Sequence, residues 1–445
     1  MKCLRLLLAA VGVLAADSTS AIETKRCFSD DFLIGSATAS YQVEGAWNES
    51  GRTTSIWDDF CREKPGLLCA NVADDFYHRY KDDIQLMVAS GMDSYRFSVS
   101  WSRVMNWDPV TKKMKANAPG IAFYHALIDE LKRSGIAPIL TLYHRDLPSE
   151  LHKQLKPQGW LNREIIDHFV QYSELMFTEF GSKVDLWNTF NEPLGFVTEG
   201  YAMGISAPGF TNSTTNAYTA GHNVLLSHGR VVQCFRELKK SSTIHDKARI
   251  SVVLSYDYAH SLNASDPMDV AAVERKIQFE FGWYLSPIVS GKYPDIMRER
   301  AGDLHTAITE FKIPVIGYTA WSFLDNYEWG SFKPRFGLYY VNFTSQTGLE
   351  DEVTPGANAL ARIPRPAAKW YAKVAKARCL DGFATELVGD RVVTIEQSLV
   401  SSISMSALVI ALIVAVPTVA WFVIRRSNTI NAHDASEATP LVQRS

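Results

Sequence analysis

Apolar runs of strand length alternate with helix-like stretches along most of the chain. The strand-like runs cover 32–40, 94–101, 138–144, 184–190 and 249–256. The stretches before the last four runs carry apolar residues at helical spacing, and they cover 74–90, 121–134, 163–180 and 217–240. Strands that alternate with helices indicate a parallel sheet, and the length favours a (β/α)₈ TIM barrel, an α/β fold, over a doubly wound sheet.

Several of these runs contain polar residues or end in them. Arg96 lies within the second run, His144 ends the third, and Asn191-Glu192 follows the fourth. In a barrel the carboxyl ends of the strands form the active face, so these residues predict a site there. Neither a Gly-x-Gly-x-x-Gly turn nor a Gly-rich phosphate loop occurs, which gives no support to a nucleotide cofactor.

The two ends of the chain predict entry into the secretory pathway and a membrane anchor. Lys2 and Arg5 precede the apolar run 6–16, as in a secretory signal, so we assign 1–21 to a signal peptide and short leader. Residues 399–424 carry no charge and are long enough to cross a bilayer, and the pair Arg425-Arg426 follows them directly. We therefore expect a single-pass type I membrane protein: a lumenal or extracellular domain at 22–396, a transmembrane helix at 399–424 and a cytoplasmic tail at 425–445. A glycolipid-anchor signal is the alternative, but such signals end in their apolar tail.

Composition adds little beyond this placement. The chain is 47% hydrophobic and 21% charged with a formal net charge of −3, which excludes wholesale disorder and gives no electrostatic reason to bind nucleic acid. Cys61 and Cys69 flank a short loop that a disulfide could close, and the odd count of cysteines after the signal leaves at least one unpaired within the chain. Four sequons, at Asn48, Asn212, Asn263 and Asn342, are candidate glycan sites.

A series of motifs resembles the family 1 glycoside hydrolases, the β-glucosidase family that also includes lactase and the klotho proteins. The motifs occur in family order, and they are Phe32-Leu-Ile-Gly-Ser-Ala-Thr-Ala-Ser-Tyr-Gln-Val-Glu-Gly-Ala46, Ser55-Ile-Trp-Asp58, Tyr95-Arg-Phe-Ser-Val-Ser-Trp-Ser-Arg103, Thr141-Leu-Tyr-His144, Trp187-Asn-Thr-Phe-Asn-Glu-Pro193 and Gly317-Tyr-Thr-Ala-Trp-Ser-Phe-Leu-Asp-Asn-Tyr-Glu-Trp329. Together they span about 28–377. The resemblance implies a TIM barrel that hydrolyses β-linked glycosides with retention and needs no cofactor and no metal.

The resemblance also assigns roles to individual residues. Glu192 matches the catalytic acid/base, Asn191 the donor to the sugar 2-hydroxyl, and Arg96 the arginine that orients the nucleophile. The remaining positions match residues that bind the terminal sugar, and they are Gln42, His144, Trp321, Glu328 and Trp329. For the tryptophans, a purely structural place in the core is the competing interpretation.

The chain departs from the family in two places. Arg145 stands where the family usually has Trp, which replaces an apolar wall of the sugar subsite by a cation. After Arg300, only 301–312 precede Ile313, which is expected to begin the eighth strand. These residues resemble the end of a helix and cannot hold two further strand–helix units, so the sequence predicts a barrel without strands six and seven. The Thr-Glu-Asn-Gly that carries the family's nucleophile is absent as well.

We therefore expect a β-glucosidase-type site that is inactive in this chain, because a retaining glycosidase needs a second carboxylate as nucleophile. A deletion in the gene model or transcript, a lineage member that has lost activity, and an unrecognised substitute nucleophile are the three explanations. The alternative function is a membrane-tethered sugar- or protein-binding module of klotho type. The expected partner in either case is a β-linked glycoside or oligosaccharide, and the sequence leaves the oligomeric state open.

Overall fold

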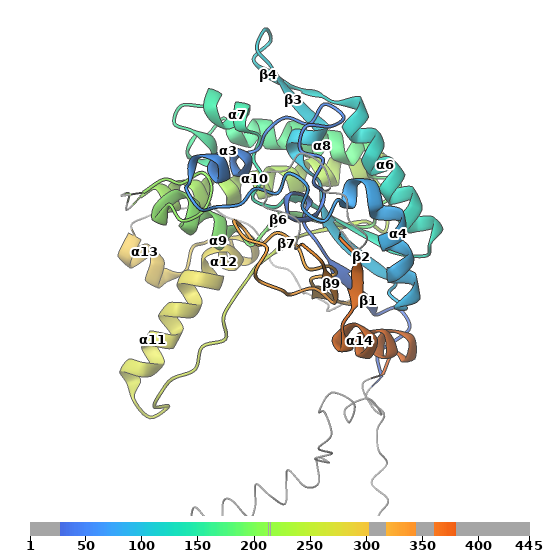
Figure 1. The fold of residues 1–445 in the computed structure, drawn as a ribbon. Coiled ribbons are helices and arrows are strands. Elements are labelled where there is room, and N and C mark those ends of the chain that lie inside the picture. The colour runs from blue at the N-terminus through green and yellow to red at the C-terminus, as the bar shows by residue number, and fades with distance from the viewer. Residues whose placement is uncertain (1–26, 212, 214, 302–316, 344–359, 380–445) are drawn as a thin grey trace, which may run out of the picture. The chain divides into compact units, whose positions relative to one another are not determined.

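The computed structural model describes residues 27–211, 213, 215–301, 317–343 and 360–379, and its central element is a parallel sheet (Figure 1). All neighbouring strands in the sheet run in the same direction. In spatial order the strands are β7 (Arg249–Val253), β6 (Leu186–Asn191), β5 (Ala137–Tyr143), β2 (Ser94–Ser98), β1 (Leu33–Ala37) and β8 (Gly317–Trp321). This is the order in which strands five, four, three, two, one and eight follow one another around a (β/α)₈ barrel, so the predicted barrel-type sheet is confirmed.

The sheet is open within the described residues. β8 pairs with β1 from Leu33↔Gly317 to Ala37↔Trp321, and β7 pairs with β6, with a register shift between Asn188 and Asn191. Among the residues that the structure describes, neither edge strand has a second neighbour. Six strands therefore form part of a barrel wall.

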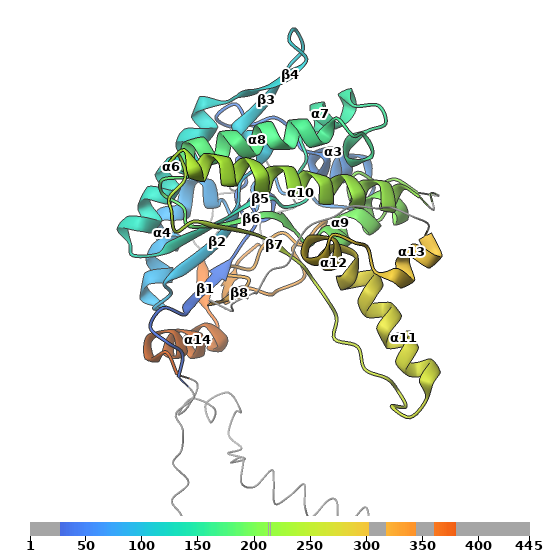
Figure 2. The ribbon, with the colours of Figure 1, turned by 180° about the vertical axis from the view of Figure 1, so that it is seen from behind.

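Four long helices cover the outer face of the wall, and Figure 2 shows α6, α8 and α10 lying across it. They are α4 (Phe76–Ala89), α6 (Ala118–Arg133), α8 (Ile165–Phe180) and α10 (Asn216–Lys240). In α8 the buried side chains recur at positions 165, 169, 172, 176 and 180, which is the spacing of one helical face. This face packs on the sheet and against α10. The helices predicted from the sequence match all four within a few residues.

The segment after β7 is packed differently. Residues 254–301, which we call the arm, contain α11 (Pro267–Ile277), the π-helix η3 (Gln278–Gly282), α12 (Trp283–Ser290) and α13 (Asp295–Ala301). In Figures 1 and 2 the loop before α11 and α11 itself extend away from the sheet. α11 has no buried residue, and Leu262 and Met268 are exposed. Only the end of the arm returns to the wall, where Trp283 and Tyr284 are buried.

Shorter elements complete the ends of the sheet. The two hairpin-like pairs are β3 (Met105–Asp108) with β4 (Lys113–Ala116), and β9 (Tyr339–Val341) with β10 (Arg362–Pro364). The short helices are α2 (Ser40–Val43), α3 (Ile56–Glu63), α5 (Trp101–Val104), α7 (Ser149–Gln154), η1 (Gly159–Leu161), α9 (Pro193–Thr198), η2 (Glu199–Met203) and α14 (Pro366–Ala377). α2, which carries the predicted site residue Gln42, follows the carboxyl end of β1, and α9 begins directly after Glu192 at the carboxyl end of β6.

Two disulfides join cysteines of the described chain. Cys61 pairs with Cys69, as the sequence suggested, and Cys27 pairs with Cys379, which links the start of the wall to the end of α14. Cys234 is the unpaired thiol. Beside the second disulfide, Arg378 donates to Ser29 O at 3.1 Å and forms an ion pair with Asp93 at 2.8 Å.

Among the described residues, no helix combines the length and the apolar character that a membrane crossing requires. The predicted signal peptide, the predicted span at 399–424 and the predicted tail lie outside the described residues.

Candidate active site

The predicted site residues gather at the carboxyl ends of five neighbouring strands. Asn191 ends β6 and Trp321 ends β8, while Arg96 lies near the end of β2 and His144 directly follows β5. The others lie on the segments that leave the strands: Gln42 in α2, Glu192 directly before α9, and Glu328 and Trp329 after β8. The contacts described next place all of them in one site.

Arg96, Asn191 and Glu192 form the centre of the site. Arg96 Nη1 donates to Asn191 Oδ1 at 3.0 Å, which fixes the orientation of the amide. Burial lowers the pKa of Arg96 to about 10, against the opposing effect of Glu192, so Arg96 is a cation at neutral pH. Glu192 has a left-handed backbone (φ +47°), its backbone N donates to Val253 O at 2.8 Å, and its side chain is 39% exposed. Its carboxylate is therefore open to a ligand.

His144 lies beside this centre as a neutral imidazole. Burial, and then the positive charges of Arg96 and Arg145, lower the pKa of His144 well below its usual value. Its Nε2 lies 3.4 Å from Asn191 Nδ2, and its buried Nδ1 has no hydrogen-bond partner. A buried polar atom without a partner is costly, and a sugar hydroxyl at this position would supply one.

Gln42 and Glu328 form a second polar group, on the segments that follow β1 and β8. Gln42 Nε2 donates to Tyr327 O at 2.9 Å and to Glu328 Oε2 at 3.3 Å, while Gln42 Oε1 is buried without a partner. Burial raises the pKa of Glu328 to about 7, although hydrogen bonds from Trp321 and Gln42 oppose the shift. The pair thus presents one unpaired acceptor and one carboxyl group to a ligand.

A row of flat side chains lines the site. The His144 ring is nearly parallel to Trp321, with centroids 5.9 Å apart, and to Trp329, with centroids 5.8 Å apart. Trp321 is 37% exposed, so its ring is not a core side chain and offers an apolar face to a sugar. Trp329 is packed on its other side against the buried Trp57, at 4.9 Å between centroids.

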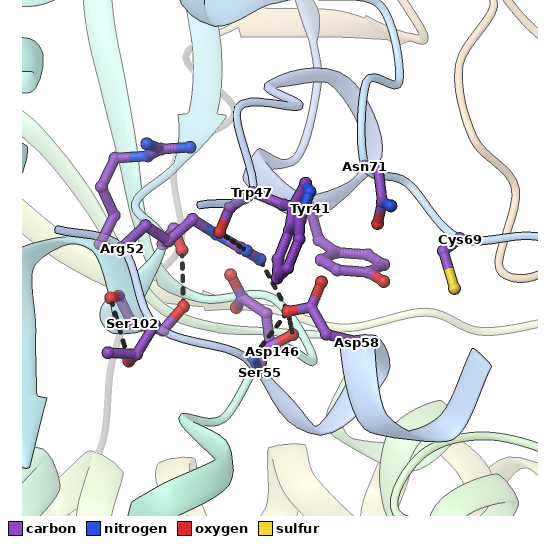
Figure 3. Close-up of polar contacts among 12 residues, drawn as sticks. Tyr41, Trp47, Arg52, Ser55, Asp58, Cys69, Asn71, Ser102 and Asp146 are labelled. Carbon is purple, nitrogen blue, oxygen red and sulfur yellow. Dashed lines mark hydrogen bonds and ion pairs between the residues drawn. The ribbon is translucent and has the colours of Figure 1, made fainter. Parts of the chain in front are cut away.

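A buried polar cluster around Asp58, which follows Trp57 in the chain, fixes the start of α3 (Figure 3). Asp58 Oδ2 accepts from Ser55 N at 2.7 Å, which caps the first turn of α3, and from Arg52 Nη2 at 2.9 Å. Both charged side chains are almost fully buried, so each one compensates the charge of the other. The cluster explains the Ser-Ile-Trp-Asp motif. Ser55 and Asp58, the polar residues at its two ends, fix the start of α3, and α3 holds Trp57 against Trp329.

Two residues make contacts in the site that the sequence did not predict. Arg145, noted only as a departure from the family, is buried and forms an ion pair with Glu199 at 2.7 Å. Its Nη2 also lies 3.7 Å from Glu192 Oε2, and its guanidinium stacks over Trp329 at 5.3 Å. Glu199, at the start of η2, carried no sequence signal, because a single glutamate in a polar helix is ordinarily a solvated side chain.

Within the described part of the chain, no group of three or more His, Cys, Asp or Glu side chains is arranged to hold a metal ion. The expectation that the reaction needs neither metal nor cofactor stays a prediction.

The family model described as "Glycosyl hydrolase family 1" matches the chain at residues 24–310 and 301–379. The chain is 36% identical over 386 residues to β-glucosidase 10 of Arabidopsis thaliana, a match that covers 80% of this chain and 74% of the relative. It is 40% identical over 304 residues to furcatin hydrolase of Viburnum furcatum, a match that covers 66% of this chain. That match spans only 55% of the relative's length.

Solved structures show the same architecture. A rice β-glucosidase superposes with a TM-score of 0.67 at 27% identity, covering 78% of this chain and 98% of the other. A Thermotoga maritima β-glucosidase in complex with deoxynojirimycin superposes with a TM-score of 0.68 at 27% identity, covering 80% of this chain and 100% of the other.

Proposed function

The chain belongs to glycosyl hydrolase family 1, and on this basis we propose that its site binds β-linked glycosides, β-glucosides in particular. The observation that supports the proposal best is the convergence of unpaired polar atoms and aromatic faces at the strand ends. Gln42 Oε1 and His144 Nδ1 are buried without partners, beside the exposed ring of Trp321. Such a mixture of hydrogen-bonding atoms and a flat apolar face matches the alternating hydroxyl and C–H surfaces of a pyranose.

Within the described residues, the site has the parts of a retaining O-glycosyl hydrolase except for the nucleophile, with Glu192 in the position of the acid/base. In a retaining enzyme the acid protonates the leaving oxygen, and a second carboxylate about 5 Å away attacks the sugar carbon from the other face. Asn191 would donate to the sugar 2-hydroxyl, and Arg96 would hold the nucleophile and the Asn191 amide in place. Arg96 already makes the second of these contacts, at 3.0 Å.

The two other carboxyl groups found in the described site do not fit the role of nucleophile. Glu199 is bound by the same guanidinium as Glu192 and follows it on the same segment, so both lie on one side of a bound sugar. Glu328 receives a hydrogen bond from Gln42 in the group proposed to bind hydroxyls. We therefore propose that this chain binds a β-glucoside without forming a glycosyl-enzyme intermediate.

The test compares the full chain with its Glu192→Gln variant on 4-nitrophenyl β-glucoside. We expect both proteins to release nitrophenol at the background rate, at every pH between 4 and 9. Turnover that is well above background and is lost in the variant would show that a substitute nucleophile exists. The genomic interval between the codons for Arg300 and Ile313 gives a second test, since an in-frame Thr-Glu-Asn-Gly there would indicate an active, longer product.

A tethered binding module is the second candidate function. It is favoured by the same combination, sugar-binding groups without an opposed nucleophile. We further infer that the domain is lumenal or extracellular and is held by one span at 399–424, which rests on the charge-free run and the following arginine pair. Protease added to sealed vesicles should then remove only a short C-terminal piece, and degradation of the large domain would contradict this topology.

A further inference from the structure

Arg145 is a buried cation inside the site, and its hydrogen bonds are only partly satisfied. Nη1 donates to Glu199 Oε2 at 2.7 Å, but Nη2 lies 3.7 Å from Glu192 Oε2, which is beyond hydrogen-bond distance. Within the described residues Nη2 has no acceptor, and Nε is buried without one. The Nη2 donor is therefore directed toward Glu192 and is available to a ligand.

The surroundings hold Arg145 in this position. Its side chain is 10% exposed, its guanidinium lies over the Trp329 ring at 5.3 Å, and Glu199 fixes one end of the fork. A side chain with a stacked plane and one anchored nitrogen has few rotamers left, so its remaining donor points in one direction.

Gly195 makes room for the guanidinium. A Cβ atom at this position would lie 2.4 Å from Arg145 Nη2 and 3.3 Å from Cζ. A side chain at position 195 would therefore force the guanidinium to shift. Arg145 and Gly195 thus act together, one supplying the donor and the other the space that it occupies.

We propose that Arg145 is a specificity-determining residue that donates from Nη2 to a hydroxyl oxygen of a neutral sugar bound beside Trp321 and Trp329. The inference rests on the proposed function and adds a residue that selects the sugar. A neutral ligand is favoured over a uronate or a sulfated sugar because both arginines of the site already face a carboxylate: Arg145 pairs with Glu199 at 2.7 Å, and Glu192 acts on Arg96. An added anion would therefore meet no uncompensated positive charge at short range.

The test measures the binding of two sugar-shaped lactams to the full chain by calorimetry. D-glucono-δ-lactam is neutral, and D-glucaro-δ-lactam carries a carboxylate in place of the primary hydroxyl. We expect the wild-type protein to bind the neutral lactam more tightly. Arg145→Met keeps the apolar stem and removes the donor, and it should weaken that binding by about ten- to a hundredfold, as expected for a hydrogen bond from a charged group.

Two further variants provide a second test of the Arg145 position and a control outside the site. Gly195→Ala changes no polar group but should weaken binding of the neutral lactam by about three- to tenfold, roughly half the effect of losing the charged hydrogen bond. Arg230→Met removes an exposed arginine of α10 that pairs with Asp167 outside the site, and it should leave binding unchanged.

The outcomes separate the two proposals. Equal affinity of wild type and Arg145→Met for the neutral lactam would overturn the role of Arg145 and leave the proposed sugar site standing. Tighter binding of the carboxylate-bearing lactam would overturn the neutral ligand class. Binding of neither lactam to the wild-type protein would overturn the proposed function, and the role of Arg145 with it.

Discussion

The two sides of the sheet are built from the same alternation of strands and helices, yet they are packed very differently. On the side of β5 and β6, α8 buries eight residues against the wall, among them Phe169 and Met176. On the side of β7, α11 follows its strand at the end of a long loop and buries none. The strands differ in the same way, since β5 is mostly buried and no residue of β7 is.

This difference shows that an amphipathic helix buries its apolar face only where neighbouring strands provide a surface for it to pack on. β5 has β2 on one side and β6 on the other, so the helices that follow β2 and β5 rest on a continuous surface. β7 has only β6 beside it within the described residues, and the surface on which α11 would pack is therefore incomplete. The hydrophobic gain per helix depends on that surface, not on the sequence of the helix alone.

The largest expected difference between the two regions comes from breaking one ion pair in the wall and one in the arm. In the wall, Arg103 Nε pairs with Glu44 at 2.9 Å and both side chains are buried, so Arg103→Met leaves an uncompensated carboxylate in the interior. We expect this variant to lower the free energy of unfolding by about 3–5 kcal/mol, measured by urea denaturation.

In the arm, Lys276 pairs with Glu280 on the surface, with side-chain exposures of 38% and 30%. Lys276→Met is the matched substitution, and we expect a change below about 0.5 kcal/mol. Equal losses in the two variants would show that the arm is packed as tightly as the wall.

The second contrast concerns pH. Asp146 is buried in the wall, where Ser40 Oγ donates to it at 2.8 Å, and burial raises its pKa to about 7. Between the ordinary aspartate pKa of about 3.9 and 7, the folded protein keeps a proton that the unfolded chain releases, so this group lowers stability as pH rises. The effect is complete above about pH 7.

Asp146→Asn removes this titration. Relative to wild type, we expect the variant to gain up to about 1.4 kcal/mol per pH unit between pH 5 and pH 7, in urea denaturation at each pH. The difference cancels the contributions of other groups, such as the buried His228, that both proteins share. Parallel stability curves for the two proteins would contradict a buried, protonated Asp146, and Val270→Ala, which removes no titratable group, serves as the parallel control.

The smallest contrast comes from shortening one aliphatic side chain in each region. Ile128 is fully buried in α6, and Ile128→Val should cost about 0.5–1.5 kcal/mol. Val270 in α11 is 48% exposed, and Val270→Ala should change stability by less than about 0.5 kcal/mol in the same assay. A comparable loss at Val270 would place a partner on the arm.

The sequence predicted the wall well because its signals are local and repeated. The periodic apolar residues of α8 and the short apolar runs of β2 and β5 specify both the element and its buried face. The expected strand at 249–256 ends early, at Val253, because a strand that is paired on one side has little to hold its last residues. The loop and the isolated helix of the arm could not be predicted from periodicity, since they depend on which neighbours are present.

The candidate site was predicted residue by residue where a motif carried it. Gln42 and Glu328 lie within hydrogen-bond distance although 286 positions separate them in the chain, and the roles assigned to the site residues stay predictions. From the sequence, Arg145 was recognised only as a change in the wall of the sugar subsite. Its contacts depend on Glu199 and Gly195, which become its neighbours only in the fold. The ion-pair partner of a buried arginine is a three-dimensional fact without a local signature.

The disulfide between Cys27 and Cys379 also decides how the domain would carry a mechanical load. A pull on the chain beyond Cys379 does not have to unwind α14 first, because the sulfur bridge passes the force directly to the segment that enters β1. β1 lies between β2 and β8 inside the sheet, where the load is shared with the pairing partners on both sides. The edge strand β7, which has no buried residue, lies outside this path. A force applied at the C-terminal end of the domain would therefore not act first on its least buried strand.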